Sequence, residues 1–155
     1  KFNSSDLGLS IRYPSTWEQV GEVESDGTLT IVAQFLSPLP KAQNGGVRAN
    51  VNLVLESITP NMTLTQYTQF GLANEEKILE GFKLLSSERV TLANHPTQKV
   101  AFTASNGYTG FTMQFQQYWF LQNGNAHVWT FADEQSTFSE HLPVFEAMLE
   151  SLVVR

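Results

Sequence analysis

The sequence predicts an α+β fold: an antiparallel β-sheet of about six or seven strands flanked by helices on both faces, forming a single α-β-α sandwich domain over residues 1–155. Several runs of residues place an apolar side chain at every second position, which is the period of a half-buried strand. Two amphipathic stretches with helical spacing stand far apart in the chain. Between them, the stretch from Val100 to Ala132 contains no Asp, Glu, Lys or Arg and holds half of the aromatic residues. This composition is typical of a sheet that is covered on both faces.

Three strands are expected before the first helix. They lie over residues 9–13, 28–36 and 47–55, and in each of them apolar side chains recur at every second position. Pro14 ends the first strand. The loop over residues 37–46 is rich in Pro and Gly and is expected to be the most mobile segment of the chain.

The first helix is expected from Thr63 to about Glu80. Thr63 and Gln66 have the spacing of a capping box, in which two side chains bond the free backbone N–H groups at a helix start. Gly81 is placed to end the helix. The expected buried stripe consists of Leu64, Tyr67, Phe70 or Gly71, Asn74 and Ile78. Residues 75–77 are expected to face water.

Four strands are expected next, over residues 84–92, 98–104, 111–122 and 126–132. A turn at Asn94-His95-Pro96 joins the first two. Asn123-Gly124 joins the last two, because both positions of a tight hairpin turn tolerate positive φ in these residue types. In the third strand one side carries Phe111, Met113, Phe115, Trp119 and Leu121. The other side carries Thr112, Gln114, Gln116 and Gln122 together with Tyr118 and Phe120.

A closing helix is predicted by apolar residues at helical spacing: Phe138, Leu142, Phe145, Leu149 and Leu152. Thr137 and Glu140 repeat the capping-box spacing. Proline is tolerated best in the first helical turn, so Pro143 moves the expected start to about Leu142.

Charge and composition exclude several classes of function. The chain has 9 basic and 15 acidic residues, a net charge of −6 and no cysteine. Its Lys and Arg residues are scattered, whereas a nucleic-acid partner would need a basic cluster. The absence of cysteine removes disulfides and thiolate chemistry. No uncharged apolar run approaches the roughly 20 residues of a membrane-spanning helix, so no direct membrane insertion is expected.

The residues also offer no recognisable reaction chemistry. His95, His127 and His141 are far apart in sequence, and neither a nucleophile elbow nor a phosphate-binding loop is present. Carboxylates stand in groups at Glu22/Glu24/Asp26, Glu75/Glu76 and Asp133/Glu134, and these groups are interpreted as solvated charges of loops and a helix face. We therefore expect no catalytic residue, no cofactor site and no metal site, and a protein that is not an enzyme.

Several segments taken together resemble the superfamily of PsbP, the Ran-binding Mog protein and the DcrB-type lipoproteins. They are the opening from Leu9 to Trp17, with its strand-Pro-x-x-Trp pattern, Gly81-Phe82-Lys83, the Asn94-His95-Pro96 turn, and the closing stretch from Leu142 to Leu152. The resemblance implies an α-β-α sandwich and roles that need no catalysis. Because members of one fold serve many functions, it carries no shared set of site residues.

Two functions follow from these observations. The first is a non-catalytic accessory or protein-binding domain of an exported or envelope-anchored protein, located outside the cytoplasm, whose lipid anchor or signal peptide would have preceded Lys1. It would be a monomer or weak dimer that binds another protein or a membrane complex. The candidate contacts, if exposed, are Tyr13, Trp17, Tyr118 and Phe120, because Trp and Tyr concentrate at binding hot spots. The second is a cytoplasmic chaperone that shields an apolar segment of a secreted protein against the uncharged stretch from Val100 to Ala132.

Overall fold

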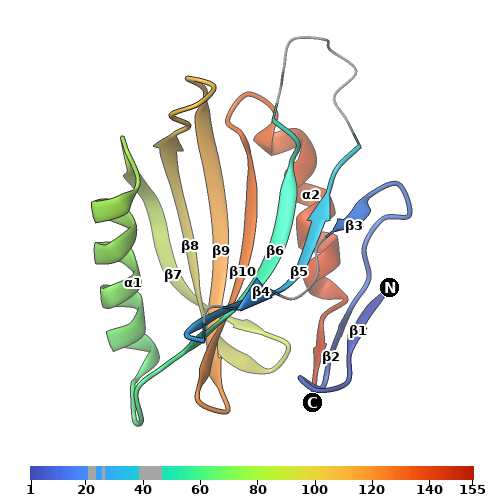
Figure 1. Ribbon diagram of the computed structural model, residues 1–155, viewed down its shortest axis with the longest axis vertical. Helices are drawn as coiled ribbons and strands as arrows, with labels where there is room; N and C mark the ends of the chain where they lie inside the picture. The colour runs from blue at the N-terminus through green and yellow to red at the C-terminus, as the bar shows by residue number, and fades with distance from the viewer. Residues whose placement is uncertain (21–23, 26, 39–46) are drawn as a thin grey trace.

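A long antiparallel sheet forms the centre of the computed structural model, which describes residues 1–20, 24–25, 27–38 and 47–155 (Figure 1). Its strands lie in the order β3 (Glu18–Val20), β5 (Leu29–Leu36), β6 (Asn50–Ser57), β10 (Asn125–Glu134), β9 (Thr112–Gln122), β8 (His95–Ser105) and β7 (Lys83–Leu92). A short strand, β4 (Glu24–Ser25), also pairs with β5. The two helices are α1 (Leu64–Ile78) and α2 (Phe138–Glu150). The predicted α+β class and the antiparallel sheet are confirmed.

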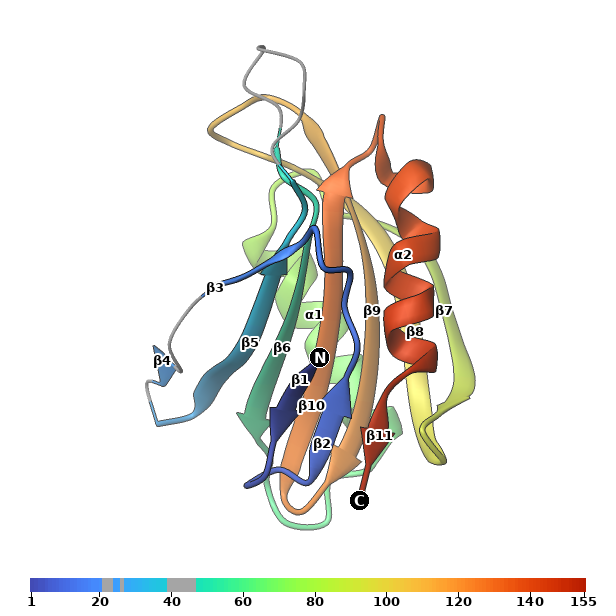
Figure 2. The same cartoon turned by 90° about the vertical axis from the view of Figure 1, so that its right-hand side faces the viewer.

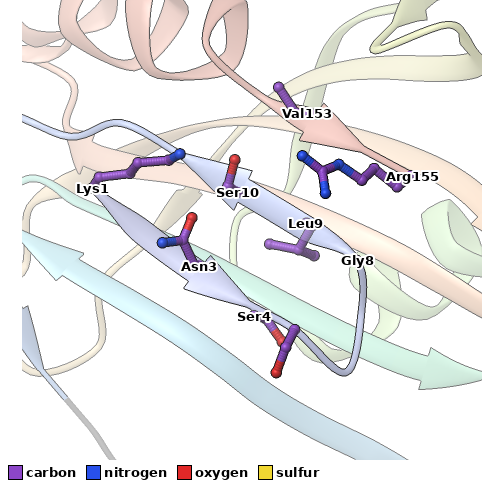
Figure 3. Close-up of a pocket in the computed structure, with 9 residues that line it drawn as sticks. Lys1, Asn3, Ser4, Gly8, Leu9, Ser10, Val153 and Arg155 are labelled. Carbon is purple, nitrogen blue, oxygen red and sulfur yellow. The ribbon is translucent and has the colours of Figure 1, made fainter.

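A second, smaller sheet brings the two ends of the chain together. It consists of β1 (Phe2–Ser4), β2 (Leu9–Ile11) and β11 (Val153–Val154), with β2 in the middle. Ser10 pairs with Val153 across almost the full length of the sequence. Figure 3 shows this sheet at close range, with the side chains of Lys1 and Arg155 near its outer strands.

The hairpin turns follow the chemistry of their residues. Asn123 and Gly124 both have positive φ, at 51° and 75°, and Asn125 pairs with Gln122 directly beside the turn. This confirms the predicted hairpin. The other turn lies one to two residues earlier than predicted, because Ala93 and Asn94 take the positive φ values and His95 already belongs to β8.

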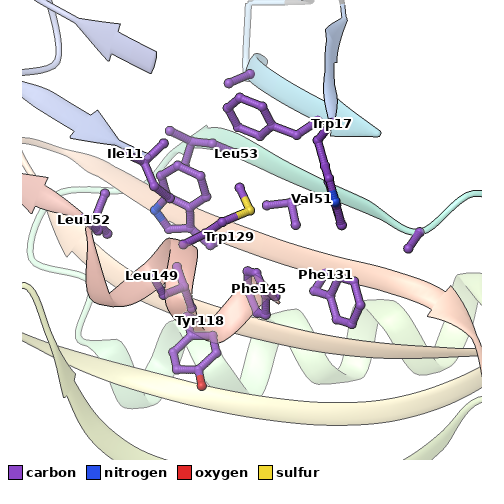
Figure 4. Close-up of a cluster of buried hydrophobic side chains, with 14 of the residues drawn as sticks. Ile11, Trp17, Val51, Leu53, Tyr118, Trp129, Phe131, Phe145, Leu149 and Leu152 are labelled. Carbon is purple, nitrogen blue, oxygen red and sulfur yellow. The ribbon is translucent and has the colours of Figure 1, made fainter. Parts of the chain in front are cut away.

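One face of the large sheet packs against α2 and the small sheet (Figure 2). The buried side chains include Ile11 from the small sheet, Leu152 from the link between α2 and β11, Trp129 and Phe131 from β10, and Phe145 from α2. The Phe131 and Phe145 rings stack with centroids 5.2 Å apart. Figure 4 shows this cluster, in which the side chains of both sheets and α2 meet.

The opposite face packs against α1. Tyr67 of α1 meets Trp119 edge to face at 5.6 Å between centroids, and Val100 and Phe102 complete this cluster from β8. Gly71 lets the helix come this close, because a Cβ atom there would stand 3.1 Å from the Trp119 ring.

The approach at Gly71 changes which face of α1 is buried. Tyr67 and Thr68 are buried. Of the two alternatives predicted for the middle of the stripe, Gly71 faces the sheet, whereas Phe70 is 67% exposed. Ile78 is 65% exposed and Asn74 is exposed as well, so the prediction is wrong for these two residues. The apolar period of α1 is weak, and the glycine decides the orientation instead of the larger side chains.

The helix starts bear out one capping prediction and correct the other. Thr63 and Gln66 form both bonds of a capping box. At α2 the Thr137 hydroxyl makes no cap bond and donates instead to Asp133 Oδ2 at 3.0 Å. Helix α2 begins at Phe138, so the start expected at Leu142 is wrong. Pro143 lies inside the helix on its exposed side, where solvent can satisfy the carbonyl that the proline leaves unbonded.

Two carboxylates expected in solvent are partly or fully buried. Asp133 is 0% exposed. Glu75 turns from α1 toward the sheet, and its buried Oε2 accepts no hydrogen bond from the described residues. Burial raises the pKa of Glu75 to about 7, although a hydrogen bond with Gln117 lowers it in part. The interpretation as solvated charges is wrong for these two residues, while Glu22 and Asp26 lie outside the described residues.

A hydrogen-bonded row of polar side chains surrounds Glu75 on the sheet. Trp119 Nε1 donates to Gln117 Oε1 at 2.9 Å, and Gln117 Nε2 donates to Thr130 Oγ1 at 3.3 Å. The Tyr67 hydroxyl donates to Glu56 Oε2 at 2.7 Å, and burial raises the pKa of this phenol. The contact between α1 and the sheet is therefore apolar at Trp119 and polar beside it.

The predicted mobile loop falls mainly on residues 39–46, which lie outside the described residues. The neighbouring prediction of a strand from residue 47 is corrected, because β6 begins at Asn50.

We expect Trp119→Ala to lower the free energy of unfolding by roughly 3–5 kcal/mol, because the side chain is 2% exposed and its loss leaves a cavity under α1. Denaturant unfolding measures this change. Phe70→Ala is the control, because it truncates an exposed ring of α1. It should change the free energy of unfolding by less than about 0.5 kcal/mol. A loss below about 1 kcal/mol at Trp119 would contradict the burial.

Glu75→Gln should stabilise the protein at about pH 8 by on the order of 1–3 kcal/mol, and should have little effect at about pH 4. The folded-state pKa of Glu75 lies above the ordinary value of 4.5 for a glutamate, so burial of the neutral carboxyl carries no charge penalty below the unfolded-state pKa. The stability that the neutral Glu75 side chain gives relative to the buried carboxylate is lost as the pH rises through about 7. Thermal melts of both chains across this pH range measure the difference. Glu76→Gln, an exposed neighbour, should show no such dependence, and an equal effect at both positions would refute the assignment to Glu75.

Candidate functional site

Helix α2 is bordered by a groove on each flank. The β7 groove, of about 540 Å³, is lined by Thr91, Leu92, Ala93, Tyr118, Glu146, Leu149, Glu150 and Leu152. The β2 groove, of about 410 Å³, is lined by Arg12, Tyr13, Pro14, Pro143, Val144, Ala147 and Met148. Figure 2 shows α2 between the segment that follows β2 and strand β7. Because these α2 residues stand on different sides of the helix, a partner could contact both grooves across its exposed ridge.

The β7 groove is lined by leucine side chains, polar groups and Tyr118. Tyr118 packs edge to face on Phe145 at 5.8 Å and is 9% exposed. Figure 4 shows its hydroxyl pointing away from the other buried side chains. Gln116 Nε2 donates to that oxygen at 3.2 Å. Burial raises the pKa of the Tyr118 phenol and Glu146 adds to the effect, whereas Lys99 opposes it.

The β2 groove combines apolar side chains with one cation. Tyr13 is half-buried, and its ring lies against Phe35 with centroids 4.6 Å apart. The backbone N–H of Arg12 donates to Ser151 Oγ at 2.8 Å, which fixes the turn after β2 to the end of α2. The Arg12 side chain itself is exposed and forms no ion pair within the described part of the chain.

The four predicted contacts therefore fall in different environments. Tyr13 and Tyr118 each line a groove beside α2. Trp17 is buried, at 7% exposure, in the cluster on the α2 face. Phe120 is 0% exposed, so a partner could reach it only if the side chains above it moved. The structure brings Tyr13 and Tyr118 to opposite flanks of one helix, and contact with a partner remains a prediction for all four.

A third hollow, of about 350 Å³, lies on the small sheet. Figure 3 shows that Asn3, Ser4 and Ser10 contribute its polar side chains. None of the predicted contacts lines it.

Two of the three histidines lie beside Phe120. Its ring stacks between His95, at 5.0 Å, and His127, at 4.7 Å between centroids. His127 is 3% exposed, and its Nδ1 has no hydrogen-bond partner in the described structure. Burial, with a smaller contribution from the nearby His95, lowers the pKa of His127 to about 4. His127 is therefore neutral near pH 7 and is held as part of the core.

The third histidine belongs to the junction of β10 and α2. His141 Nδ1 lies 2.7 Å from Asp133 Oδ2, which also accepts the Thr137 hydroxyl. Asp133 Oδ1 accepts the backbone N–H of Glu134 at 2.8 Å. These bonds satisfy a buried carboxylate and fix the start of α2, and no described interaction adds a nucleophile to the pair.

Within the ranges that the structure describes, no three His, Asp or Glu side chains gather as a group that could hold a metal ion. No described helix is long and apolar enough to cross a membrane.

Sequence reasoning missed Arg12, Glu146 and Glu150 as groove residues. A signal was present for the two carboxylates, because they stand four residues apart in a predicted helix that contains no Lys or Arg. Such a spacing places both on one side of the helix. Nothing in the local sequence indicates that Arg12 faces α2.

No protein-family model matches the sequence, and no curated protein matches it. Solved structures do match. The protein of unknown function PA94 from Pseudomonas aeruginosa is 16% identical with a TM-score of 0.65, and the match covers 95% of this chain and 97% of PA94. LpqN, involved in cell envelope biogenesis of Mycobacterium tuberculosis, is 15% identical with a TM-score of 0.67, over 94% of this chain and 82% of LpqN.

The cyanobacterial PsbP, CyanoP, from Synechocystis sp. PCC 6803 has a TM-score of 0.67 at 12% identity, over 99% of this chain and 91% of CyanoP. These identities are too low to carry a function from one protein to another. They agree with the resemblance seen in the sequence, and the chain has a PsbP-like fold.

Proposed function

We propose that residues 1–155 form a single non-catalytic accessory domain, an α-β-α sandwich of the PsbP type, that binds another protein or a membrane complex through the surface of α2. The observation that carries the proposal is the pair of grooves on the flanks of this helix. They bring Tyr13 and Tyr118, two residue types that dominate binding hot spots, to one side of the molecule.

The chemistry of the grooves supports binding. The β2 groove is lined mainly by apolar side chains, and the β7 groove combines leucine side chains with polar and charged groups, so the two grooves together offer the apolar and polar contacts of a protein interface. The Asp133 and His141 pair at the start of α2 is engaged in fixing the fold. A reaction would instead need a nucleophile, a base and a charge-stabilising group to converge at one point.

We further propose that the domain works outside the cytoplasm, in a protein that is exported or anchored to the cell envelope. The likeness to LpqN, which is involved in cell envelope biogenesis, and to the cyanobacterial PsbP supports this location. The gene sequence upstream of Lys1 tests it. A signal peptide or lipobox supports export, and a start Met directly before Lys1 supports the cytoplasmic alternative.

The chaperone hypothesis needs an open groove lined by the uncharged stretch from Val100 to Ala132. Most of the large side chains of this stretch, among them Phe102, Trp119 and Phe131, are buried under the chain's own helices and small sheet, and Tyr108 is the exposed exception among those described. A client segment would have to displace these elements. No observation favours this function over binding at α2.

A photo-reactive amino acid placed at Ala147 in the β2 groove, or at Thr91 in the β7 groove, should cross-link the same partner in extracts of the native organism. Both positions are exposed at the edges of the grooves. An excess of unlabelled wild-type chain should suppress the adduct, whereas a Tyr13→Ala chain should suppress it less. Mass spectrometry identifies the adduct.

The control for cross-linking carries the same photo-reactive group at Glu76, which is exposed on α1. This control should give no adduct that an excess of unlabelled wild-type chain suppresses. An equal adduct from Glu76, or none from either α2 position, would show that α2 is not the binding surface.

A screen of esterase, phosphatase and glycosidase substrates should detect no turnover. The proposal that the domain is not an enzyme would be overturned by turnover that disappears when His95, His127 or His141 is changed, provided that the variants remain folded. Circular dichroism of each variant controls for folding.

A further inference from the structure

We propose that the β7 groove recognises a basic, apolar segment of the partner protein, in which two Lys or Arg side chains flank a Leu-like residue. This inference rests on the proposed function, because it names the chemistry that one of the two grooves would bind. The groove is lined by Leu92, Leu149 and Leu152, of which the last two are largely buried, together with polar groups that include the exposed carboxylates of Glu146 and Glu150.

The positions of the two carboxylates do not stabilise helix α2. Glu146 and Glu150 are four residues apart on α2, where like charges repel each other. Glu150 also ends the helix, where the macrodipole disfavours negative charge. Helix α2 has no basic residue in its last turn, and neither carboxylate forms a salt bridge with the described residues.

The cation nearby is already engaged. Lys99 Nζ stands 5.9 Å from the centre of the Tyr118 ring and forms an ion pair with Glu88 of β7 at 3.6 Å. Glu146 and Glu150 are exposed beside the leucine side chains that line the groove. A complementary ligand therefore supplies cationic groups to the carboxylates and an apolar group to the leucines.

The spacing of the carboxylates sets the spacing of the ligand. Four residues of an α-helix rise about 6 Å, and basic side chains one helical turn apart, or two residues apart in a strand, match this separation. The nine Lys and Arg residues of this chain are scattered, with no two closer than six residues. No short segment of a second copy offers such a pair, so the ligand belongs to a different protein.

A short amphipathic peptide with Leu on one face and two Lys residues one helical turn apart is the probe. It should bind the full chain, measured by fluorescence anisotropy, and a twin peptide with Glu in place of Lys should bind at least about tenfold more weakly. The double variant Glu146→Gln/Glu150→Gln should weaken binding of the Lys peptide by about tenfold and should reduce its salt dependence.

The matched control is Glu76→Gln/Glu80→Gln, which removes two exposed carboxylates at the same spacing on the other side of the sheet. It should leave the affinity within about twofold. Equal weakening by both double variants would mean that the net charge of the chain, and not the groove, attracts the peptide, and this would overturn the inference.

A thermal melt separates recognition from a structural role. The groove variant should unfold at the same or a higher temperature, because it loses two unfavourable charges near the end of α2. A lower melting temperature, or no binding of the Lys peptide, would also overturn the inference. Cross-linking from Ala147 in the other groove would still succeed in that case if α2 is the binding surface, so failure here is distinguishable from failure of the proposed function.

Discussion

Strand β9 is covered by the chain itself on both faces, and the other elements are arranged around this constraint. Trp119 points to α1, while its neighbours Tyr118 and Phe120 point to the face that carries α2. A charged side chain at these positions would lose its hydration with no partner in reach, which explains the uncharged composition from Val100 to Ala132. Because both faces must be covered, each helix is held in place by residues distant from it in sequence. Gly71 shows how closely α1 is fitted, since a Cβ atom there would stand 3.1 Å from the Trp119 ring.

Local sequence patterns predicted the long strands. Strands β7 to β10 and the turn at Asn123-Gly124 follow from alternation and from the conformational freedom of two residues. Strands β1, β3, β4 and β11 are two or three residues long, and pairing between positions as distant as Ser10 and Val153 leaves no local signal. The buried face of α1 was predicted wrongly at Asn74 and Ile78, since the period of apolar residues cannot show that a glycine fits against a tryptophan ring.

The candidate site was predictable only in part. Alternation placed Tyr118 and Phe120 on the same side of β9, yet it could not show that Phe120 would be covered by two histidine rings while Tyr118 would reach the edge of a groove. Asp133 was assigned to solvent because charged residues usually lie there. Its burial depends on hydrogen bonds with Thr137 and His141, which exist only once α2 has docked.

The separation of core and groove residues explains how proteins with 12% to 16% identity can share this fold. The core fixes α2 through Phe145, Met148 and Leu149, whereas Arg12, Glu146 and Glu150 stand at exposed positions that the packing does not constrain. Substitution at such positions costs little stability and changes what the grooves attract. The grooves here carry charges of opposite sign on the two flanks of one helix. A partner that spans both would meet Arg12 on one side and two carboxylates on the other, so it would bind in one orientation.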